Sequence, residues 1–256
     1  MQEDALPPTT AGTLLGGRIA FAQPATGYRA AIDPVLLAAS VPSAARTALE
    51  LGAGAGAATL CLAARCPALA IAAAERDPVM ARLARRNVAA NAMDGRVTVI
   101  EADIRALSRE AHGRFAAVFF NPPFLPPGRA SVSPDGGRRA ANVEAGAGLV
   151  DWVAIAARML APRGALRLIH RADRLHEVMA ALARHFGDIA VLPLWPRAGV
   201  PAKRILVAAR LGARGGARLL PGLVLHEGGG GFSAGAQAVL RDGASLEDAF
   251  GPVCAL

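Results

Sequence analysis

The chain is nearly without lysine. Lys203 is the only one, although lysine and arginine together number 28 against 20 acidic residues, so the formal net charge of +8 comes almost entirely from arginine. An excess of cations on a compact protein favours a polyanionic partner such as nucleic acid. An arginine-rich, lysine-poor composition also arises from codon usage, so the charge supports such a partner without establishing it.

Cysteine is also scarce. Cys61, Cys66 and Cys254 are odd in number and lack the spacing of metal ligands. This pattern indicates reduced, mostly buried thiols in a cytosolic protein. We therefore expect no zinc site and no other metal site.

Long apolar runs are missing as well. Hydrophobic residues make up 53% of the chain, but many are alanine, and no uninterrupted run approaches the roughly 18 to 20 residues that span a bilayer. The opening residues, MQEDALPPTT, lack the basic and apolar regions of a secretory signal. We expect a soluble protein without a membrane segment, located in the cytoplasm.

From about Thr47 the sequence alternates short apolar runs with helical patterns, which is typical of βαβ units and a parallel sheet. The first four strand candidates are TALELG (47–52), ALAIAAAE (68–75), RVTVIEAD (96–103) and FAAVFFN (115–121).

The alternation resumes beyond residue 148. A helix at 149–160, a PRG turn at 162–164 and a strand at 165–170 come first, and a helix from about 173 to 185 follows. Two runs at 188–195 and 204–211 are close enough in sequence to form an antiparallel hairpin. Parallel strands that end in an antiparallel pair differ from a dinucleotide dehydrogenase sheet and are expected of a class I methyltransferase.

The stretch LELGAGAG, residues 49–56, runs from a strand into glycines and then a helix. Glycines let a backbone turn sharply and approach a ligand, and the following helix offers free N–H groups. Glu75, at the end of the next strand, can accept both hydroxyls of a ribose. A strand, glycines, a helix and an acidic residue in this order predict a nucleotide cofactor. The cofactor could also be a dinucleotide, because Gly52, Gly54 and Ala57 satisfy the dinucleotide-binding pattern.

Asp103 ends the third strand, where its carboxylate could accept a hydrogen bond from an adenine amine of the cofactor. An equally good interpretation is an N-cap for the segment that follows.

The fourth strand ends in NPPF, Asn121 to Phe124. Proline has no N–H and a fixed φ, so Pro122 and Pro123 make this segment stiff and rich in acceptors. The Asn121 side-chain oxygen and the Pro122 carbonyl can each accept one hydrogen of a planar exocyclic amine, and Phe124 can stack on its ring. An ordinary turn is the alternative, and the position behind the glycine motif favours base binding.

NPPF together with ELGAGAG resembles the amino-methyltransferases that use S-adenosylmethionine. Five further segments restrict the resemblance to a smaller group of these enzymes: GYRAAIDPVLLAA, FNPPFLPPG, SPDGGRRAANVE, LIHRADRL and LPLWPRAGVPAKRILVAARLG. Together they resemble the bacterial tRNA adenine-N6 methyltransferases that modify the adenosine beside the anticodon of a valine tRNA. The similarity runs from about Gly27 to Leu246.

The resemblance implies an α/β fold with a Rossmann-like sheet of about seven strands, mostly parallel with a C-terminal antiparallel hairpin, and helices on both faces. Residues 1–46 would cap the cofactor site, 47–212 would form the methyltransferase core, and 213–256 would extend the same domain.

The resemblance also assigns residues. Those expected to hold S-adenosylmethionine are Tyr28, Arg29, Asp33, Glu50, Gly52, Gly54, Gly56, Glu75, Asp103 and Asn121. Asn121, Pro122, Pro123 and Phe124 would hold the target base. Asp33 has a second interpretation, as an N-cap with Pro34 at the first helical position. Phe124 departs from the family, in which many relatives have tyrosine, but it keeps the stacking face.

Transfer of a methyl group needs alignment more than a strong base, and the five histidines form no acid–base group. The expected partner is tRNA, and the protein is expected to be a monomer. Two groups of cations could bind RNA or simply lie on a solvated surface. The first, in a long loop at 125–146, is Arg129, Arg138 and Arg139, and the second, near the final hairpin, is Arg197, Lys203 and Arg204.

Other functions stay open. A ribosomal RNA guanine-N2 methyltransferase also acts on an exocyclic amine. Release-factor methyltransferases, which modify glutamine N5, carry a helical domain ahead of the glycine loop, where this chain has only residues 1–48. A non-catalytic nucleotide- or RNA-binding module, or a nicotinamide enzyme that contains NPPF by chance, is the alternative from another class.

Overall fold

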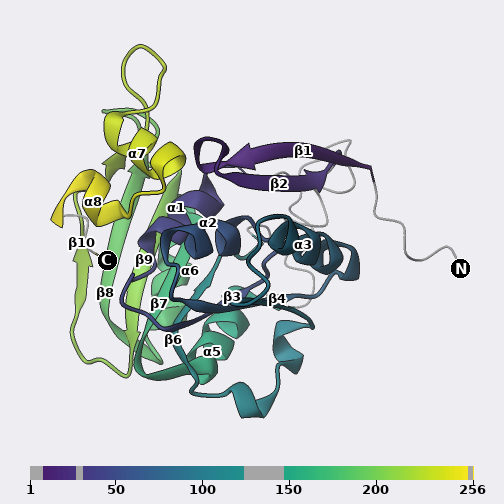
Figure 1. Ribbon diagram of the computed structural model, residues 1–256. Coiled ribbons are helices and arrows are strands. Elements are labelled where there is room, and N and C mark those ends of the chain that lie inside the picture. Colours follow the sequence, from purple (N-terminus) through teal and green to yellow (C-terminus); the bar gives the residue numbers. More distant parts are fainter. Residues whose placement is uncertain (1–7, 27–30, 124–146, 253–255) are drawn as a thin grey trace, which may run out of the picture.

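The computed structural model describes residues 8–26, 31–123, 147–252 and 256. Its main feature is a central sheet covered by helices (Figure 1). The sheet has nine strands in the order β10-β8-β9-β7-β6-β3-β4-β5, with β11 beside β8. The strands are β3 (Thr47–Leu51), β4 (Ala70–Glu75), β5 (Val97–Glu101), β6 (Phe115–Phe120), β7 (Leu160–Arg171), β8 (Phe186–Trp195), β9 (Arg204–Leu211), β10 (Ala217–Leu219) and β11 (Leu223–Val224).

The strand directions confirm the predicted sheet. Strands β3 to β7 run parallel to their neighbours, and only β9 is antiparallel to β7 and to β8. The short strands β10 and β11 extend the sheet beyond β8. Because β3 to β6 are parallel, the loops after their last residues all lie at one edge, where ligands of open α/β sheets bind.

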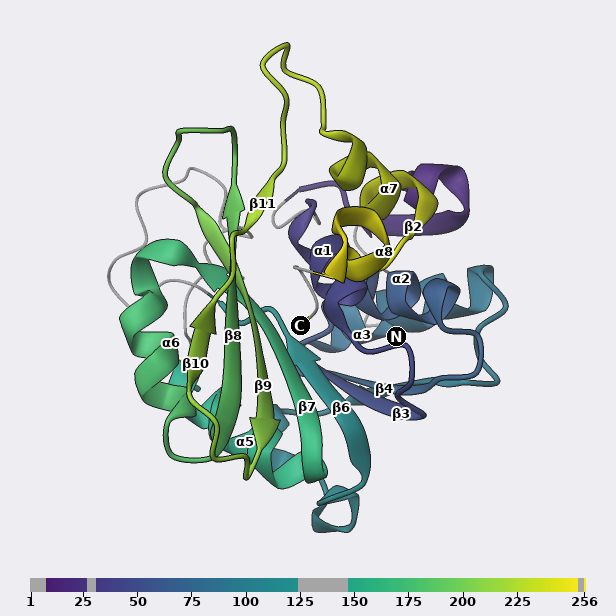
Figure 2. The same ribbon diagram turned by 90° about the vertical axis from the view of Figure 1, so that its left-hand side faces the viewer.

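Helices cover both faces of the sheet (Figure 2). On one face lie α1 (Asp33–Ser40), α2 (Ala57–Arg65) and α3 (Pro78–Ala90), with α7 (Ala234–Asp242) and α8 (Leu246–Phe250) packed against α1. On the other face lie α5 (Leu149–Met159) and α6 (Leu175–Leu182). The 3-10 turns are η1 (Leu15–Gly17), η2 (Ile104–Ala106), η3 (Arg109–Ala111) and η4 (Ala172–Arg174).

The core follows from the two-residue period of the strands. Phe119 packs with the α1–α2 side, whereas Phe120 packs with the α5–α6 side, and both are fully buried. Burial of one such ring stabilises the fold by about 1.5 to 3 kcal/mol. The sequences of the central strands are therefore continuous apolar runs, because helices cover both faces of the sheet.

Two predicted boundaries in the second half were wrong. The expected PRG turn lies inside β7, where the pairing with β6 shifts between Phe115 and Ala117, whose partners are Leu160 and Ala165. Arg163 has a φ of 59°, so the turn forms as a bulge within the strand. The helix expected at 173–185 begins as η4 and ends earlier, at Leu182.

The ends of the chain hold elements that the sequence pattern did not reveal. The strands β1 (Thr9–Leu14) and β2 (Ile19–Pro24) form a separate antiparallel hairpin beside α3 (Figure 1). The C-terminal tail, read only for short strands, contains the helices α7 and α8. Among the described residues, no helix combines the length and apolarity needed to cross a membrane.

Candidate cofactor and base-binding site

The glycine loop joins β3 to α2 at the carboxyl edge of the sheet. Gly52 has a φ of 68°, a conformation that residues with a Cβ rarely adopt. A Cβ on Gly52 would also lie 2.6 Å from a ring carbon of Trp152, on α5. The loop therefore needs glycine at this position for both its backbone conformation and its packing.

Glu50 lies beneath this loop, with only 4% of its surface exposed. The hydroxyl of Thr59, on α2, donates a hydrogen bond to its carboxyl group. The pKa of Glu50 is raised to about 8, mainly because the carboxyl group is buried; the hydrogen bonds from Thr59 lower this pKa, and the charge of Glu75 raises it. Because this pKa lies above neutrality, Glu50 is mostly protonated at pH 7 and links β3 to α2.

Glu75 faces the glycine loop from the end of β4. One carboxylate oxygen accepts a hydrogen bond from the Gly54 N–H at 2.7 Å, and the other accepts one from the Asp77 N–H at 2.8 Å. Each oxygen keeps a second lone pair, which a hydroxyl group can use. The two backbone N–H groups thus hold the half-buried Glu75 carboxylate in a defined orientation.

Asp103 follows β5 and caps η2. Its carboxylate accepts hydrogen bonds from the Arg105 backbone N–H at 2.9 Å and from the Arg105 guanidinium. The side-chain hydrogen bond from Arg105 is the main reason that the pKa of Asp103 falls to about 2. The N-cap interpretation is therefore confirmed, while contact with a cofactor adenine stays a prediction.

Asn121 follows β6 at the same edge, with Pro122 and Pro123 behind it. Within the described part of the chain, its side-chain Oδ1 is buried and has no hydrogen-bond partner. A buried acceptor without a donor costs about 1 to 3 kcal/mol. An arrangement that tolerates this cost is suited to accept a hydrogen bond from a ligand.

Asp33 does not cap α1. It is the first helical residue, no side-chain cap bond forms there, and Pro34 is the second residue rather than the first. Instead, the Asp33 carboxylate accepts a hydrogen bond from Arg204 Nε at 2.9 Å. The pair forms because β9 begins beside α1, which no local pattern reveals.

The cations predicted near the final hairpin lie at the same edge of the sheet. Arg197 and Lys203 are exposed in the connection between β8 and β9, and Arg204 begins β9. Arg171, at the end of β7, is the register partner of Arg204. Tyr28, Arg29, Phe124, Arg129, Arg138, Arg139 and the loop at 125–146 lie outside the described residues.

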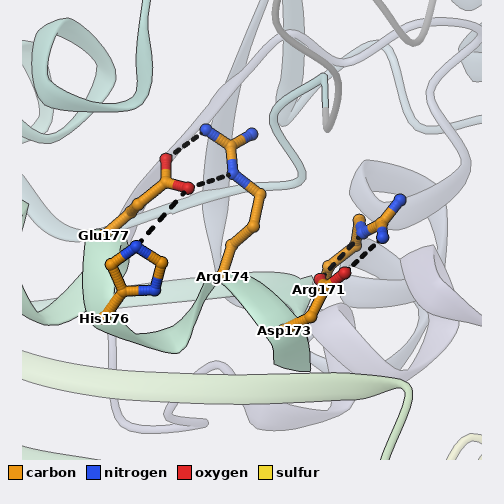
Figure 3. Close-up of polar contacts among 5 residues, drawn as sticks. All are labelled: Arg171, Asp173, Arg174, His176 and Glu177. Carbon is orange, nitrogen blue, oxygen red and sulfur yellow. Dashed lines mark hydrogen bonds and ion pairs between the residues drawn. The ribbon is translucent and has the colours of Figure 1, made fainter. Parts of the chain in front are cut away.

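Sequence reasoning missed the ion pairs that follow β7 (Figure 3). Arg171 Nε donates to Asp173 Oδ1 at 2.9 Å, and Arg174 Nε donates to Glu177 Oε1 at 2.9 Å. His176 lies 3.9 Å from the Glu177 carboxylate. Hydrogen bonds from the arginines lower the pKa of both Asp173 and Glu177. The closely spaced basic and acidic residues of HRADRLHE, residues 170–177, were the sequence feature that could have predicted these ion pairs.

Trp152 was also missed. Its ring centroid lies 5.6 Å from that of Phe120, and its benzo edge touches the glycine loop. Helical spacing on α5 predicts an apolar face, but it does not show that this face reaches the loop. Across the described ranges, no cluster of three histidine, cysteine, aspartate or glutamate side chains could hold a metal ion.

Comparison with solved structures identifies the fold. A predicted O-methyltransferase from Agrobacterium tumefaciens is 31% identical, with a TM-score of 0.69 over 83% of this chain and 97% of that chain. TYW2 from M. jannaschii, in complex with AdoMet, shares the fold at 14% identity, with a TM-score of 0.57 over 80% of this chain and 87% of its own. The sheet order and the glycine loop define a class I methyltransferase that uses S-adenosylmethionine.

Sequence comparison identifies the family. The family model "Methyltransferase small domain" matches residues 31–193. A tRNA1(Val) (adenine(37)-N6)-methyltransferase from Aeromonas hydrophila is 34% identical over 78% of this chain and 84% of its own length. One of the same name from Porphyromonas gingivalis is 33% identical over 61% of this chain and 64% of its own. The chain belongs to the tRNA1(Val) (adenine-N6)-methyltransferase family, within the methyltransferase small-domain proteins.

Proposed function

We propose that the protein transfers a methyl group from S-adenosylmethionine to the exocyclic N6 of an unpaired adenosine in tRNA. The expected target is the adenosine beside the anticodon of tRNA1(Val), in line with the names of the relatives. The observation that carries the proposal is the buried, unpartnered Oδ1 of Asn121 at the carboxyl edge. An adenine N6 amine offers the hydrogen-bond donor that this acceptor lacks.

The residues of the NPPF segment have distinct proposed roles. Asn121 Oδ1 accepts one N6 hydrogen and the Pro122 carbonyl accepts the other, so the nitrogen lone pair turns away from both acceptors. Pro123 keeps the segment stiff because its φ is fixed. Phe124 stacks on the adenine ring, a contact worth about 1 to 3 kcal/mol. S-adenosylmethionine, when bound, supplies a methyl group on a positively charged sulfur.

The pocket for S-adenosylmethionine is assigned to the edge formed by β3, β4 and β5. The glycines at 52, 54 and 56 let the backbone approach the ligand, with Glu50 buried beneath them. Glu75 would accept the ribose hydroxyls with its remaining lone pairs, and Asp103 would accept the adenine amine. Tyr28, Arg29 and Asp33 belong to residues 1–46, which we propose to cap this pocket.

The arginine-rich edge is the proposed RNA contact. Arg197 and Lys203 are exposed, and Arg204 and Arg171 lie beside each other at the β7–β9 boundary. Cations at one edge attract a phosphate backbone without reading its sequence. Arg129, Arg138 and Arg139 would add to this surface.

An anticodon-loop adenosine is already unpaired, so bringing it into a pocket costs less than flipping a base out of a duplex. We propose that the reaction takes place in the cytoplasm, because its proposed substrate is tRNA. We further propose that the protein acts as a monomer, and that 47–212 and 213–256 form one domain.

The test is incubation with labelled S-adenosylmethionine and, separately, total tRNA, total ribosomal RNA and release factors. Mass spectrometry of digested nucleosides should find N6-methyladenosine in tRNA alone. Label in ribosomal RNA or in protein, without N6-methyladenosine in tRNA, would overturn the proposed substrate. The matched control compares two unmodified tRNA1(Val) transcripts, one with the target adenosine and one with guanosine in its place; only the first should be methylated.

A further inference from the structure

The N-terminal hairpin is attached to the molecule by two asparagine side chains, Asn87 within α3 and Asn91 directly after its last residue, Ala90. Asn87 Oδ1 accepts a hydrogen bond from the Ala22 N–H at 2.9 Å, and its Nδ2 donates to the Ala22 carbonyl at 2.8 Å. One helical turn further, Asn91 bonds to the N–H and the carbonyl of Ala20 in the same way, at 2.9 and 2.8 Å. Each amide therefore pairs with one residue of β2 as a neighbouring strand would.

The spacing explains why this pairing works. Residues four apart on a helix are separated by about 6 Å along its axis, and residues two apart on a strand by about 6.8 Å. Ala20 and Ala22 thus present their backbone groups at nearly the spacing of Asn87 and Asn91. The two side chains thus provide hydrogen-bond partners for the backbone N–H and carbonyl groups on the edge of β2 that faces away from β1.

The two asparagines differ in their second donor hydrogen. Asn91 uses it within its own helix, on the Asn87 carbonyl at 2.7 Å. Asn87 uses it on the carbonyl of Ala55, in the glycine loop, at 2.9 Å. Asn87 is only 2% exposed, and Ala55 is 7% exposed. A single buried amide therefore bonds simultaneously to the hairpin and to the loop that joins β3 to α2.

We propose that Asn87 is a positioning residue for cofactor binding, which couples the glycine loop to the β1–β2 hairpin. By holding the Ala55 carbonyl on the inner side of the loop, it fixes one peptide plane between Gly54 and Gly56. Glu75 holds the neighbouring Gly54 N–H from the other side, at 2.7 Å. The proposal rests on the proposed assignment of this loop as the cofactor site.

A merely structural role predicts a different outcome. If the asparagines only attach the hairpin, their loss should lower stability and leave ligand affinity alone. If Asn87 positions the loop, its loss should weaken cofactor binding specifically, because the loop must regain its shape when the ligand binds. Asn91→Ala is the matched control, since it breaks the same kind of hairpin bonds without touching the loop.

The experiment measures the Kd of S-adenosylhomocysteine by isothermal titration calorimetry without RNA, and the Tm of each ligand-free variant. We expect a lower Tm for both variants, with the larger decrease for Asn87→Ala, because Asn87 is buried whereas Asn91 is half-buried. The Kd should rise on the order of tenfold for Asn87→Ala, as expected for one lost hydrogen bond, and stay within about twofold for Asn91→Ala. Turnover should show a raised KM for S-adenosylmethionine with little change in kcat.

Equal Kd values for the two variants, or no change in either, would overturn the inference. A wild-type protein that binds the ligand but leaves tRNA unmethylated would overturn only the proposed substrate, because the titration contains no RNA. No ligand binding by the wild type would overturn both.

A second measurement uses the wild type alone, in case Asn87→Ala does not fold. Hydrogen exchange followed by NMR should show that S-adenosylhomocysteine slows exchange of the Ala20 and Ala22 amides severalfold, since both are linked to the loop through Asn87 and α3. Slower exchange in the glycine loop with unchanged β2 amides would contradict the coupling.

Discussion

The two halves of the sheet edge differ in how they present polar groups. Around β3, β4 and β6, the edge presents a protonated Glu50, a Glu75 carboxylate oriented by two backbone N–H groups, and a buried Asn121 oxygen without a partner among the described residues. Between β7 and β9, the groups are arginines, several of which pair with a carboxylate, as Arg171 pairs with Asp173. The first half is suited to a small ligand held by directed hydrogen bonds, and the second to a polyanion.

The difference has a physical cause. A hydrogen bond in a half-buried site is strong and specific because little water competes for it. Exposed ion pairs contribute only about 0 to 1 kcal/mol to stability, so their arginines can exchange a carboxylate for a phosphate at small cost. Single substitutions in the two halves test this contrast.

Asn121→Ala should give the largest effect. Removal of the acceptor should lower the single-turnover rate of tRNA methylation by about 10³ or more, while the Kd of S-adenosylhomocysteine stays nearly unchanged. Rapid-quench kinetics and calorimetry measure the two quantities. Lost ligand affinity with normal residual turnover would contradict the assigned role.

Gly52→Ala should impair both folding and ligand binding. The new methyl group would meet Trp152 in a left-handed backbone, and each problem costs about 1 to 3 kcal/mol. Thermal unfolding and calorimetry check the loss. In a Trp152→Leu background, Gly52→Ala should cost less, because only the backbone problem remains; an equal cost in both backgrounds would refute the assigned clash.

Arg197→Ala and Lys203→Ala should each weaken tRNA binding about threefold to tenfold and reduce the salt slope of log Kd by about 1. The Kd of S-adenosylhomocysteine should not change. Filter binding between low and moderate salt measures the slope. The matched control is Arg85→Ala, which removes an exposed cation paired with Glu101 on the far side of the sheet. An equal loss of tRNA affinity in that control would remove the distinction between the two halves.

Glu50→Gln concerns the pH dependence of stability. The folded pKa of Glu50, about 8, lies above its ordinary value of 4.5, so the folded state holds a proton that the unfolded state has lost. Stability from this proton is complete below pH 4.5 and disappears as the pH rises through 8. Glu50→Gln should remove this decline in Tm. A wild-type Tm that is flat from pH 5 to 8 would contradict the raised pKa.

Much of the sheet could be predicted because its signal is local. Strands β3, β4, β5 and β6 begin and end within about two residues of the predicted runs, and the glycines of LELGAGAG open the loop as expected. The positions of Glu75 and Asn121 follow from the same rule, since parallel strands bring their carboxyl ends to one edge. The proposed roles of these residues stay predictions until ligands are bound.

The corrections concern interactions between residues far apart in the chain. Asp33 pairs with Arg204 and does not cap α1, and the hairpin depends on Asn87 in α3 and on Asn91 at the end of that helix, much later in the chain. A two-stranded hairpin is marginal alone, so its own residues carried no strong signal. The turn predicted at 162–164 was wrong for the same reason, because the bulge in β7 forms through pairing with β6.

The sequence alone predicts the succession of strands and helices from β3 to β9, the glycine loop and the residue types at the sheet edge, because apolar periodicity and turn chemistry act over a few residues. Only the tertiary structure decided which side chains meet: Trp152 beneath Gly52, Arg204 on Asp33, and one amide of Asn87 between hairpin and loop. Such contacts depend on how whole elements pack, and packing satisfies buried polar groups with whatever partner the fold brings close.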